Sequence, residues 1–289
     1  MTWVNATLQG ILLGGLFGLF AAGLSLVFGV MRLVNLAHGD IAVLAAFCAF
    51  VVVKANGAPP LLALLAVVPV LALFGYVLQR FLLNRTVGVD PLPSLLVTFG
   101  LAVIVQNVLL EVFSADTRGL DVGGLATASL SLPGGLRIGW LSLLTFAVAV
   151  AIIGALQVFL SSSAQGRALR ATADDPEVAR LVGLDSRHVY ATATALAFAT
   201  VAVAGVFLAA RTTFNPTSGS SLLIFAFEAV IIGGLGSLWG TLAGGVILGV
   251  AQTVGAQIDP TLGILVGHLV FLTVLAIRPQ GLLPQVVTA

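Results

Sequence analysis

The stretch GRALRATADDPEVARLVGLDSR, residues 166–187, concentrates charge in a chain that otherwise carries little of it. The whole sequence is 59% hydrophobic and only 8% charged. A charged side chain inside a lipid bilayer is costly, so this stretch must lie outside the membrane. We therefore place a single charged loop within residues 161–188 and expect the rest of the chain to be organised around it.

A short helix with defined ends is predicted inside this loop. Asp174 and Asp175 are favourable N-cap residues, and Pro176 suits the first helical position. Glu177 completes an Asp-x-x-Glu capping box, and Gly183 supplies a stop. The pattern predicts a helix of about two turns.

The predicted helix has a narrow apolar ridge. Val178, Leu181 and Val182 fall on one face because they are spaced i, i+3 and i+4. Such a ridge needs a groove to pack into. Two interpretations remain open: the helix packs on the chain's own membrane domain, or it docks into a groove of a soluble partner.

Composition indicates an all-α, polytopic integral membrane protein with a single domain over residues 1–289. Several apolar runs approach the roughly 20 residues that span a bilayer. The first run follows no basic n-region, so we expect it to be retained as a membrane span. The net charge of +1, without a basic patch, argues against nucleic acid binding. The lone Cys48 excludes an intramolecular disulfide.

Nine apolar segments predict about eight to ten transmembrane helices. They cover residues 8–30, 41–53, 61–83, 94–112, 140–160, 189–210, 222–235, 239–257 and 262–277. A re-entrant segment within residues 33–40 would change this number without moving the charged loop.

The basic residues predict the orientation, because short cytoplasmic loops are enriched in Lys and Arg. A cytoplasmic charged loop places the N-terminus outside, the C-terminus inside and residues 113–139 on the far face. Eight basic residues then lie on the cytoplasmic side and four on the far side, which supports this orientation. The cytoplasmic residues are Arg32, Arg80, Arg85, Arg167, Arg170, Arg180, Arg187 and Arg278, and those on the far side are Lys54, Arg118, Arg137 and Arg211.

Small residues predict close helix contacts. Gly14 and Gly18 belong to a small-residue stripe in the first span. Residues 233–240 are too glycine-rich for an ordinary helix interior, so the chain should break or cross a neighbour closely there. The glycines concerned are Gly233, Gly234, Gly236 and Gly240.

The sequence NLAHGD, residues 35–40, precedes the second apolar segment. We interpret Asp40 as the N-cap of that segment, and His38 and Gly39 as parts of a tight turn. These roles are structural.

Few polar residues lie within the apolar segments, and they are the candidates for lining a translocation path. Glu228 is the acid expected within the bilayer, where such residues usually face a cavity or a partner. A structural, hydrogen-bonded role for Glu228 remains equally open. The candidate path residues are Asn35, Thr98, Gln106, Asn107 and Glu228.

The sequence contains no motif for catalysis, metal binding or nucleotide binding. Lys54, the single lysine, is not preceded by a glycine-rich phosphate loop. His38, His188 and His268 lack metal-ligand spacing, and no serine sits in a Gly-x-Ser-x-Gly elbow. We expect no enzyme activity, no catalytic residues, no metal and no cofactor bound by this chain.

Four motifs together resemble the permease subunits of the branched-chain amino acid ABC transporter family, of the LivH type. They are NLAHGD at 35–40, GRALRATADDPEVARLVGLD at 166–185, GGLGSLWGTLAGG at 233–245 and RPQGLL at 278–283. The resemblance covers essentially the whole chain. It implies the ABC importer permease fold and a multi-pass location in a bacterial or archaeal cytoplasmic (inner) membrane.

The resemblance also implies partners. These are a second homologous permease chain, in a heterodimer or homodimer, two cytoplasmic ATPase subunits that carry ATP and Mg, and an extracytoplasmic substrate-binding protein received by residues 113–139. Residues 174–183 look like the coupling helix that seats on an ATPase subunit. The coupling set is Arg170, Asp174, Asp175, Glu177, Val178, Arg180, Leu181 and Val182.

Branched-chain amino acids are the expected cargo, although related systems move other amino acids, urea, amides or aromatic acids. The competing class is an ATP-independent secondary transporter or channel for a small polar or amphipathic solute. That class requires several ionisable groups within the membrane, and Glu228 alone supports it thinly. A structural membrane scaffold would leave the motif set unexplained.

Overall fold

The computed structural model describes residues 2–88, 90–132 and 136–283. It confirms the all-α expectation, with one antiparallel hairpin, β1–β2, as the departure. The elements are α1 (Thr2–Met31), α2 (His38–Asn56), η1 (Pro60–Ala63), α3 (Leu64–Phe81), η2 (Leu83–Arg85), α4 (Leu92–Phe113), α5 (Gly124–Thr127), β1 (Ser129–Leu132), β2 (Leu136–Gly139), α6 (Trp140–Ser162), α7 (Ala164–Asp174), α8 (Pro176–Leu181), α9 (Ser186–Arg211), α10 (Gly219–Gly233), α11 (Leu238–Ile258) and α12 (Leu262–Ile277).

Each of the nine predicted apolar segments corresponds to a helix. Among the described residues, seven helices are long and apolar enough to cross a membrane. The other two, α10 and α12, are apolar but have 15 and 16 residues. At about 1.5 Å per residue they are shorter than the roughly 30 Å hydrocarbon core of a bilayer.

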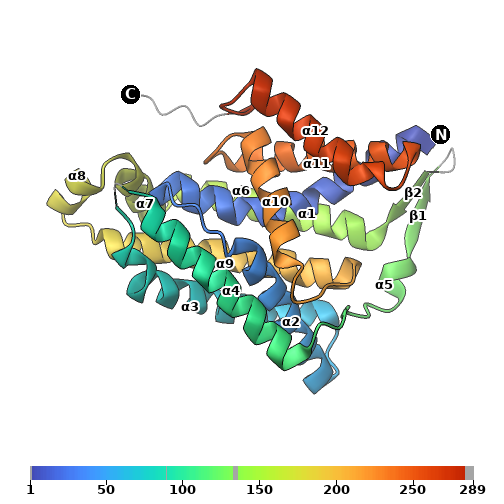
Figure 1. Ribbon diagram of the computed structural model, residues 1–289, viewed down its shortest axis with the longest axis horizontal. Helices are drawn as coiled ribbons and strands as arrows, with labels where there is room; N and C mark the ends of the chain where they lie inside the picture. The colour runs from blue at the N-terminus through green and yellow to red at the C-terminus, as the bar shows by residue number, and fades with distance from the viewer. Residues whose placement is uncertain (1, 89, 133–135, 284–289) are drawn as a thin grey trace.

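Two helices, α1 and α9, form the centre of the bundle. α1 packs against α11, α9 and α6, whereas α9 packs against α3, α1 and α2. Around them, α3, α4 and α6 expose large apolar side chains such as Leu65 and Leu96, as a surface in contact with lipid requires. Figure 1 shows α10 crossing the bundle at a steep angle to α1 and α9.

Glycines bring α1 and α11 into backbone contact, as the small-residue stripe predicted. Gly14 lies against the backbone of Val246, and Gly18 against Leu242 farther along. On α11, a Cβ added to Gly245 would lie 2.7 Å from both the carbonyl oxygen of Gly14 and the amide nitrogen of Gly18. The two helices run antiparallel, because positions later in α1 meet positions earlier in α11.

The predicted break at residues 233–240 is confirmed. α10 ends at Gly233, and Gly234 and Gly236 adopt φ of 111° and 82°, a region that favours glycine. Gly233 and Gly240 pack backbone to backbone, so the chain also crosses itself closely here. The amides of Leu282 and Leu283 donate to the carbonyls at the end of α10, each at 2.9 Å. The RPQGLL segment therefore closes the open end of α10.

The charged loop and the β hairpin lie at opposite ends of the bundle (Figure 1). The N-terminal end of α1 is beside the hairpin, where Gln9 Nε2 donates to the carbonyl of Arg137 at 2.6 Å. This arrangement agrees with the predicted relation between the N-terminus, residues 113–139 and the charged loop. The three residues between the strands lie outside the described part of the chain.

We predict that Gly245→Ala and Gly100→Ala shift stability in opposite directions. Gly245→Ala forces α1 and α11 apart and should cost about 1–3 kcal/mol. Gly100 has open space around its Cβ position, so Gly100→Ala should gain up to about 1 kcal/mol from helix propensity. Thermal unfolding of the two variants in detergent measures this, and equal shifts would contradict the close α1–α11 contact.

Candidate coupling and transport sites

The charged loop folds into two capped helices, α7 and α8. Ser163 Oγ accepts from the amide of Gly166 at 2.8 Å at the start of α7. Asp175 Oδ1 accepts from the amides of Glu177 and Val178, at 2.8 and 3.0 Å, at the start of α8. These caps satisfy amides that have no partner within the helix.

The predicted capping box in this loop is wrong in register. α7 continues through Asp174, so Asp175 alone is the N-cap of α8. Glu177 then stands at the second helical position, one residue short of the position that a capping box requires. The predicted stop is confirmed, because Gly183 adopts φ of 90° just after the helix.

The apolar ridge of α8 faces solvent at one end of the molecule. Val178, Leu181 and Val182 are 54%, 86% and 73% exposed. Ala179, at 2% exposed, lies on the opposite face of α8, which packs against the rest of the protein. The ridge therefore does not pack on the chain's own membrane domain. Around it lies an exposed charged rim formed by Arg170, Asp174, Glu177 and Arg180.

Polar contacts tie the region that follows α8 to α3. Arg80 Nη1 lies 2.8 Å from Asp185 Oδ2, and Asn84 Nδ2 donates to the carbonyl of Arg187 at 3.0 Å. The hydrogen bond from Arg80 holds the pKa of the Asp185 carboxyl below its usual value. Asp185 also caps α9, where its Oδ1 accepts from the amide of Arg187 at 3.0 Å. These contacts join the segment that follows α8 to both α3 and α9.

The chain re-enters the bundle between α1 and α2. His38 Nε2 donates to the carbonyl of Phe20 at 2.8 Å, and Phe20 lies about 16 Å along α1 from the end of that helix at Met31. Leu33 and Asn35 in the connecting segment are buried. Residues 33–37 are therefore a non-helical, re-entrant segment that is buried or half-buried in the protein, whereas Arg32 before it is exposed.

The predicted roles of NLAHGD are wrong in detail. α2 begins at His38 with Ala37 as N-cap, so Asp40 is the third helical residue and caps nothing. Gly39 lies inside the helix and forms no turn. Instead Asn35 organises the turn, because its Oδ1 accepts from the amide of Ala37 at 3.0 Å.

The N-terminal ends of α2 and α10 meet inside the bundle. Gly39 lies against the carbonyl of Gly219, the first residue of α10, and Asp40 Oδ1 fills the space that a side chain at Gly219 would need. Both helices begin deep in the molecule because α2 starts beside the middle of α1. The positive ends of two helix dipoles thus lie near the Asp40 carboxyl group.

The residues predicted to line a translocation path do not come together around one cavity among the described residues. Asn35 and Thr98 are buried, and Thr98 Oγ1 donates within its own helix to the carbonyl of Ser94 at 2.9 Å. Gln106 is half-buried, and Asn107 is exposed on α4, which packs mainly against α2. A role for these residues in the path stays a prediction.

Glu228 on α10 has a partner that sequence reasoning missed. The carboxyl group is buried, and its Oε1 contacts Nδ1 of His268 on α12, whose side chain is 37% exposed. The ring of His268 also stacks on Phe225 at a centroid distance of 6.2 Å. Glu228 and His268 are 40 positions apart in the sequence, so no local pattern signalled the contact.

The segment at the far end of the bundle is attached to the core by backbone pairing. The amide of Arg118 donates to the carbonyl of Phe214, and the reverse bond also forms, both at 2.8 Å. Arg118 Nη2 also lies 3.1 Å from Asp116 Oδ2. Asp116, Asp121 and Arg137 are exposed there. In the part of the chain that the structure describes, no three His, Cys, Asp or Glu side chains could hold a metal ion.

The described residues thus form a helical bundle with an exposed charged loop at one end and a non-helical break inside. The family described as branched-chain amino acid transport system / permease component matches residues 6–275. The chain belongs to this family. The resemblance carried by the four motifs is thereby confirmed, and the chain is a multi-pass membrane protein of the permease family.

Several curated members of the permease family cover nearly the whole chain. It is 29% identical to the high-affinity branched-chain amino acid transport system permease protein BraD of Pseudomonas aeruginosa, over 97% of this chain and 95% of that protein. It is 28% identical to the corresponding protein LivH of Salmonella typhimurium, over 95% of this chain and 93% of that protein.

A relative with a different named cargo also matches. The fructose import permease protein FrcC of Rhizobium meliloti is 31% identical, over 67% of this chain and 55% of that protein. No solved structure matches the chain.

We predict that the Glu228–His268 contact stabilises this permease. His268→Leu leaves a buried carboxyl group without its partner and should lower the free energy of unfolding by about 1–3 kcal/mol. The double variant Glu228→Leu/His268→Leu should recover most of this loss, because no polar group is left buried and unpaired. Thermal unfolding in detergent checks both, with Leu265→Ala on the exposed face of α12 as control. A double variant no more stable than His268→Leu would contradict the prediction.

Proposed function

We propose that this chain is a permease subunit of an ATP-driven importer that moves branched-chain amino acids across a bacterial or archaeal cytoplasmic membrane. The observation that carries the proposal is the exposed apolar ridge on the capped helix α8, at the end of a family-matched membrane bundle. Protein–protein interfaces commonly have an apolar centre surrounded by a polar rim, and the exposed ridge with its charged rim has this arrangement. The relatives named for branched-chain amino acids support the cargo.

ATP binding and hydrolysis would belong to separate subunits. The single lysine of the chain, Lys54, lies in α2 and has no glycine-rich phosphate loop before it. Two cytoplasmic ATPase subunits would bind ATP and Mg, and each would receive an α8 ridge from one of two permease chains. The second permease chain is a homologous subunit or a second copy, and an extracytoplasmic binding protein would deliver cargo to residues 113–139.

Movement of the ATPase subunits would reach the centre of the bundle through α9. The Arg80–Asp185 contact lies at the start of α9, one residue before the helix begins. Farther along, Gly205 of α9 packs on the carbonyl of Ala42 in α2, and Ala197 packs on Gly23 in α1. A shift of α9 would therefore change the surroundings of the break where α2 and α10 begin, as rigid-body switching requires.

The path for cargo would run along the N-terminal part of α10. Ser220, Ser221 and Ile224 are exposed there, beside the buried break. Exposed hydroxyl groups on a helix that begins deep in the bundle suit a water-filled path better than lipid. Half-helix N-termini also favour the carboxylate of an amino acid. The path would lie between this chain and the second permease subunit.

We expect Val178→Asp/Leu181→Asp to abolish co-purification of co-expressed ATPase subunits. Both side chains are largely exposed, so the permease should keep its thermal unfolding temperature while the interface loses its apolar centre. Leu130→Asp, on the hairpin at the opposite end, is the matched control and should retain the ATPase subunits. The measurement is the amount of ATPase subunit bound per tagged permease.

Uptake of leucine into proteoliposomes decides between the two classes of transporter. The proposed importer requires ATP, the ATPase subunits and the binding protein, and the α8 variant should lower uptake in proportion to lost ATPase binding. A native chain that purifies alone and moves leucine without ATP would contradict the proposal in favour of a secondary transporter. ATP-driven uptake of fructose and not leucine would contradict only the cargo.

A further inference from the structure

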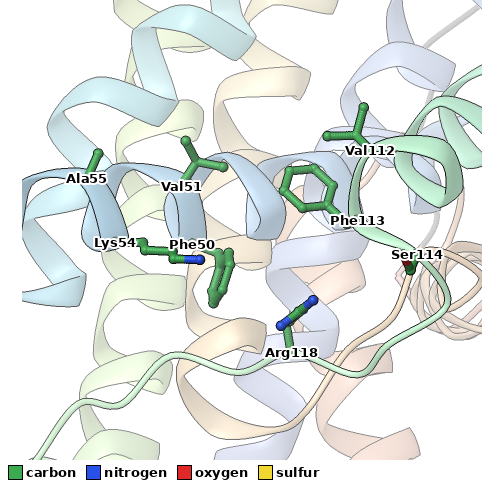
Figure 2. Close-up of a pocket in the computed structure, with 8 residues that line it drawn as sticks. All are labelled: Phe50, Val51, Lys54, Ala55, Val112, Phe113, Ser114 and Arg118. Carbon is green, nitrogen blue, oxygen red and sulfur yellow. The ribbon is translucent and has the colours of Figure 1, made fainter.

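A cavity of about 580 Å³ opens at the end of the bundle opposite α8. It lies between the C-terminal ends of α2 and α4, and Lys54, Arg118 and Ser114 contribute polar groups to its wall. Figure 2 shows the two basic side chains on either side of the Phe50 ring. The Lys54 ammonium group lies 6.0 Å from the ring centroid, and the Arg118 guanidinium carbon lies 5.7 Å from it. Both basic residues line the cavity, and the Phe50 ring stands between their charged groups.

Arg118 is held in place by its backbone and by its side chain. Its backbone is paired with Phe214, and one face of its guanidinium group is engaged by Asp116. Its Nε is buried and has no hydrogen-bond partner among the described residues. Lys54 forms no ion pair within the described part of the chain. The Asp116 carboxylate offsets much of the Arg118 charge, so the uncompensated charge that an anion in the cavity would meet is that of Lys54.

A second cavity, of about 270 Å³, continues from the first into the apolar part of the bundle. The two share Val51 and Phe113 in their walls. The second lies between α2, α3 and α4, and its walls are apolar apart from the thiol of Cys48. Val51 and Val70 in its wall are 46% and 59% exposed, so it is open to the side from which lipid approaches.

The dimensions of the combined space fit one leaflet of a bilayer. From Lys54 back to Leu44, α2 rises about 15 Å. That distance is about half of the roughly 30 Å hydrocarbon thickness, which is the depth that one acyl chain occupies. The charged end lies where α2 and α4 leave the membrane, which is the level of lipid phosphate groups. A branched-chain amino acid also has a carboxylate and an apolar part, but it is much shorter than this space.

We propose that the two cavities form one binding site for an anionic phospholipid. Its phosphate lies beside the edge of the Phe50 ring, within reach of the Lys54 ammonium group and of the exposed part of the Arg118 guanidinium group, and an acyl chain lies in the groove between α2, α3 and α4. Basic pockets between membrane helices bind anionic headgroups in this way. Because α4 packs mainly against α2, the lipid would also fasten α4 to α3. The inference does not depend on the cargo or on the ATPase subunits.

Native mass spectrometry of the full chain in detergent, titrated with phosphatidylglycerol or phosphatidylcholine of equal acyl length, tests the proposal. We expect one phosphatidylglycerol to bind at least tenfold more tightly than phosphatidylcholine. Lys54→Gln should weaken phosphatidylglycerol binding about fivefold, the ratio expected for about 1 kcal/mol per basic side chain near an anionic surface. Arg137→Gln, an exposed arginine at the same end, should leave it unchanged.

The groove is tested separately with Ala66→Phe, which fills its wall on α3. Binding of both lipids should fall, whereas Leu65→Phe, one residue away on a 77% exposed position, should have no effect. If Ala66→Phe does not fold, Lys54→Gln decides alone. Equal binding of the two lipids, or unchanged binding by Lys54→Gln, overturns the proposal. Displacement of phosphatidylglycerol by leucine also overturns it and makes the cavity an entrance for cargo.

Discussion

The need to cover non-helical backbone at membrane depth is the constraint on which the rest of this structure depends. Peptide groups outside a helix cannot face hydrocarbon without losing their hydrogen bonds. Here residues 33–37 run back into the bundle, where Asn35 Oδ1 accepts from the amide of Ala37 and His38 Nε2 donates to the carbonyl of Phe20. The surrounding helices, above all α1 and α9, hide this break from lipid. Their glycines let the backbones approach closely enough to do so.

The same break brings two helix ends into contact. Helices α2 and α10 begin at the break and touch at Gly39 and Gly219, so a small shift of either changes the geometry of both N-terminal ends. At the N-terminal end of α9, Asp185 forms a solvent-exposed ion pair with Arg80. An ion pair in water contributes little free energy, so this contact serves to position α8 more than to stabilise the fold. Packing along α9 thus connects the region of the α8 ridge with the centre of the bundle.

Helix number and local breaks followed from the sequence, whereas contacts between distant residues did not. Apolar length predicted nine helices, and the glycines at 233–240 predicted a break because few other residues tolerate φ of 111°. The exposed ridge of α8 followed from spacing. Asp40 was misjudged as a cap because cap propensity is local, while its true neighbour, Gly219, is fixed only by the crossing of α2 and α10. The Glu228–His268 contact is non-local in the same way.

The two kinds of exposed surface on the bundle indicate two different surroundings. Along α3 and α4 the exposed side chains are large and apolar, for example Leu65, Leu96 and Phe99, which suits lipid. Near the start of α10, by contrast, Ser220 and Ser221 are exposed beside a helix end that carries positive dipole charge. Hydrocarbon solvates neither hydroxyl groups nor a helix end, so this face requires water or protein against it. The described part of the chain leaves this face uncovered, because Ser220 and Ser221 are exposed.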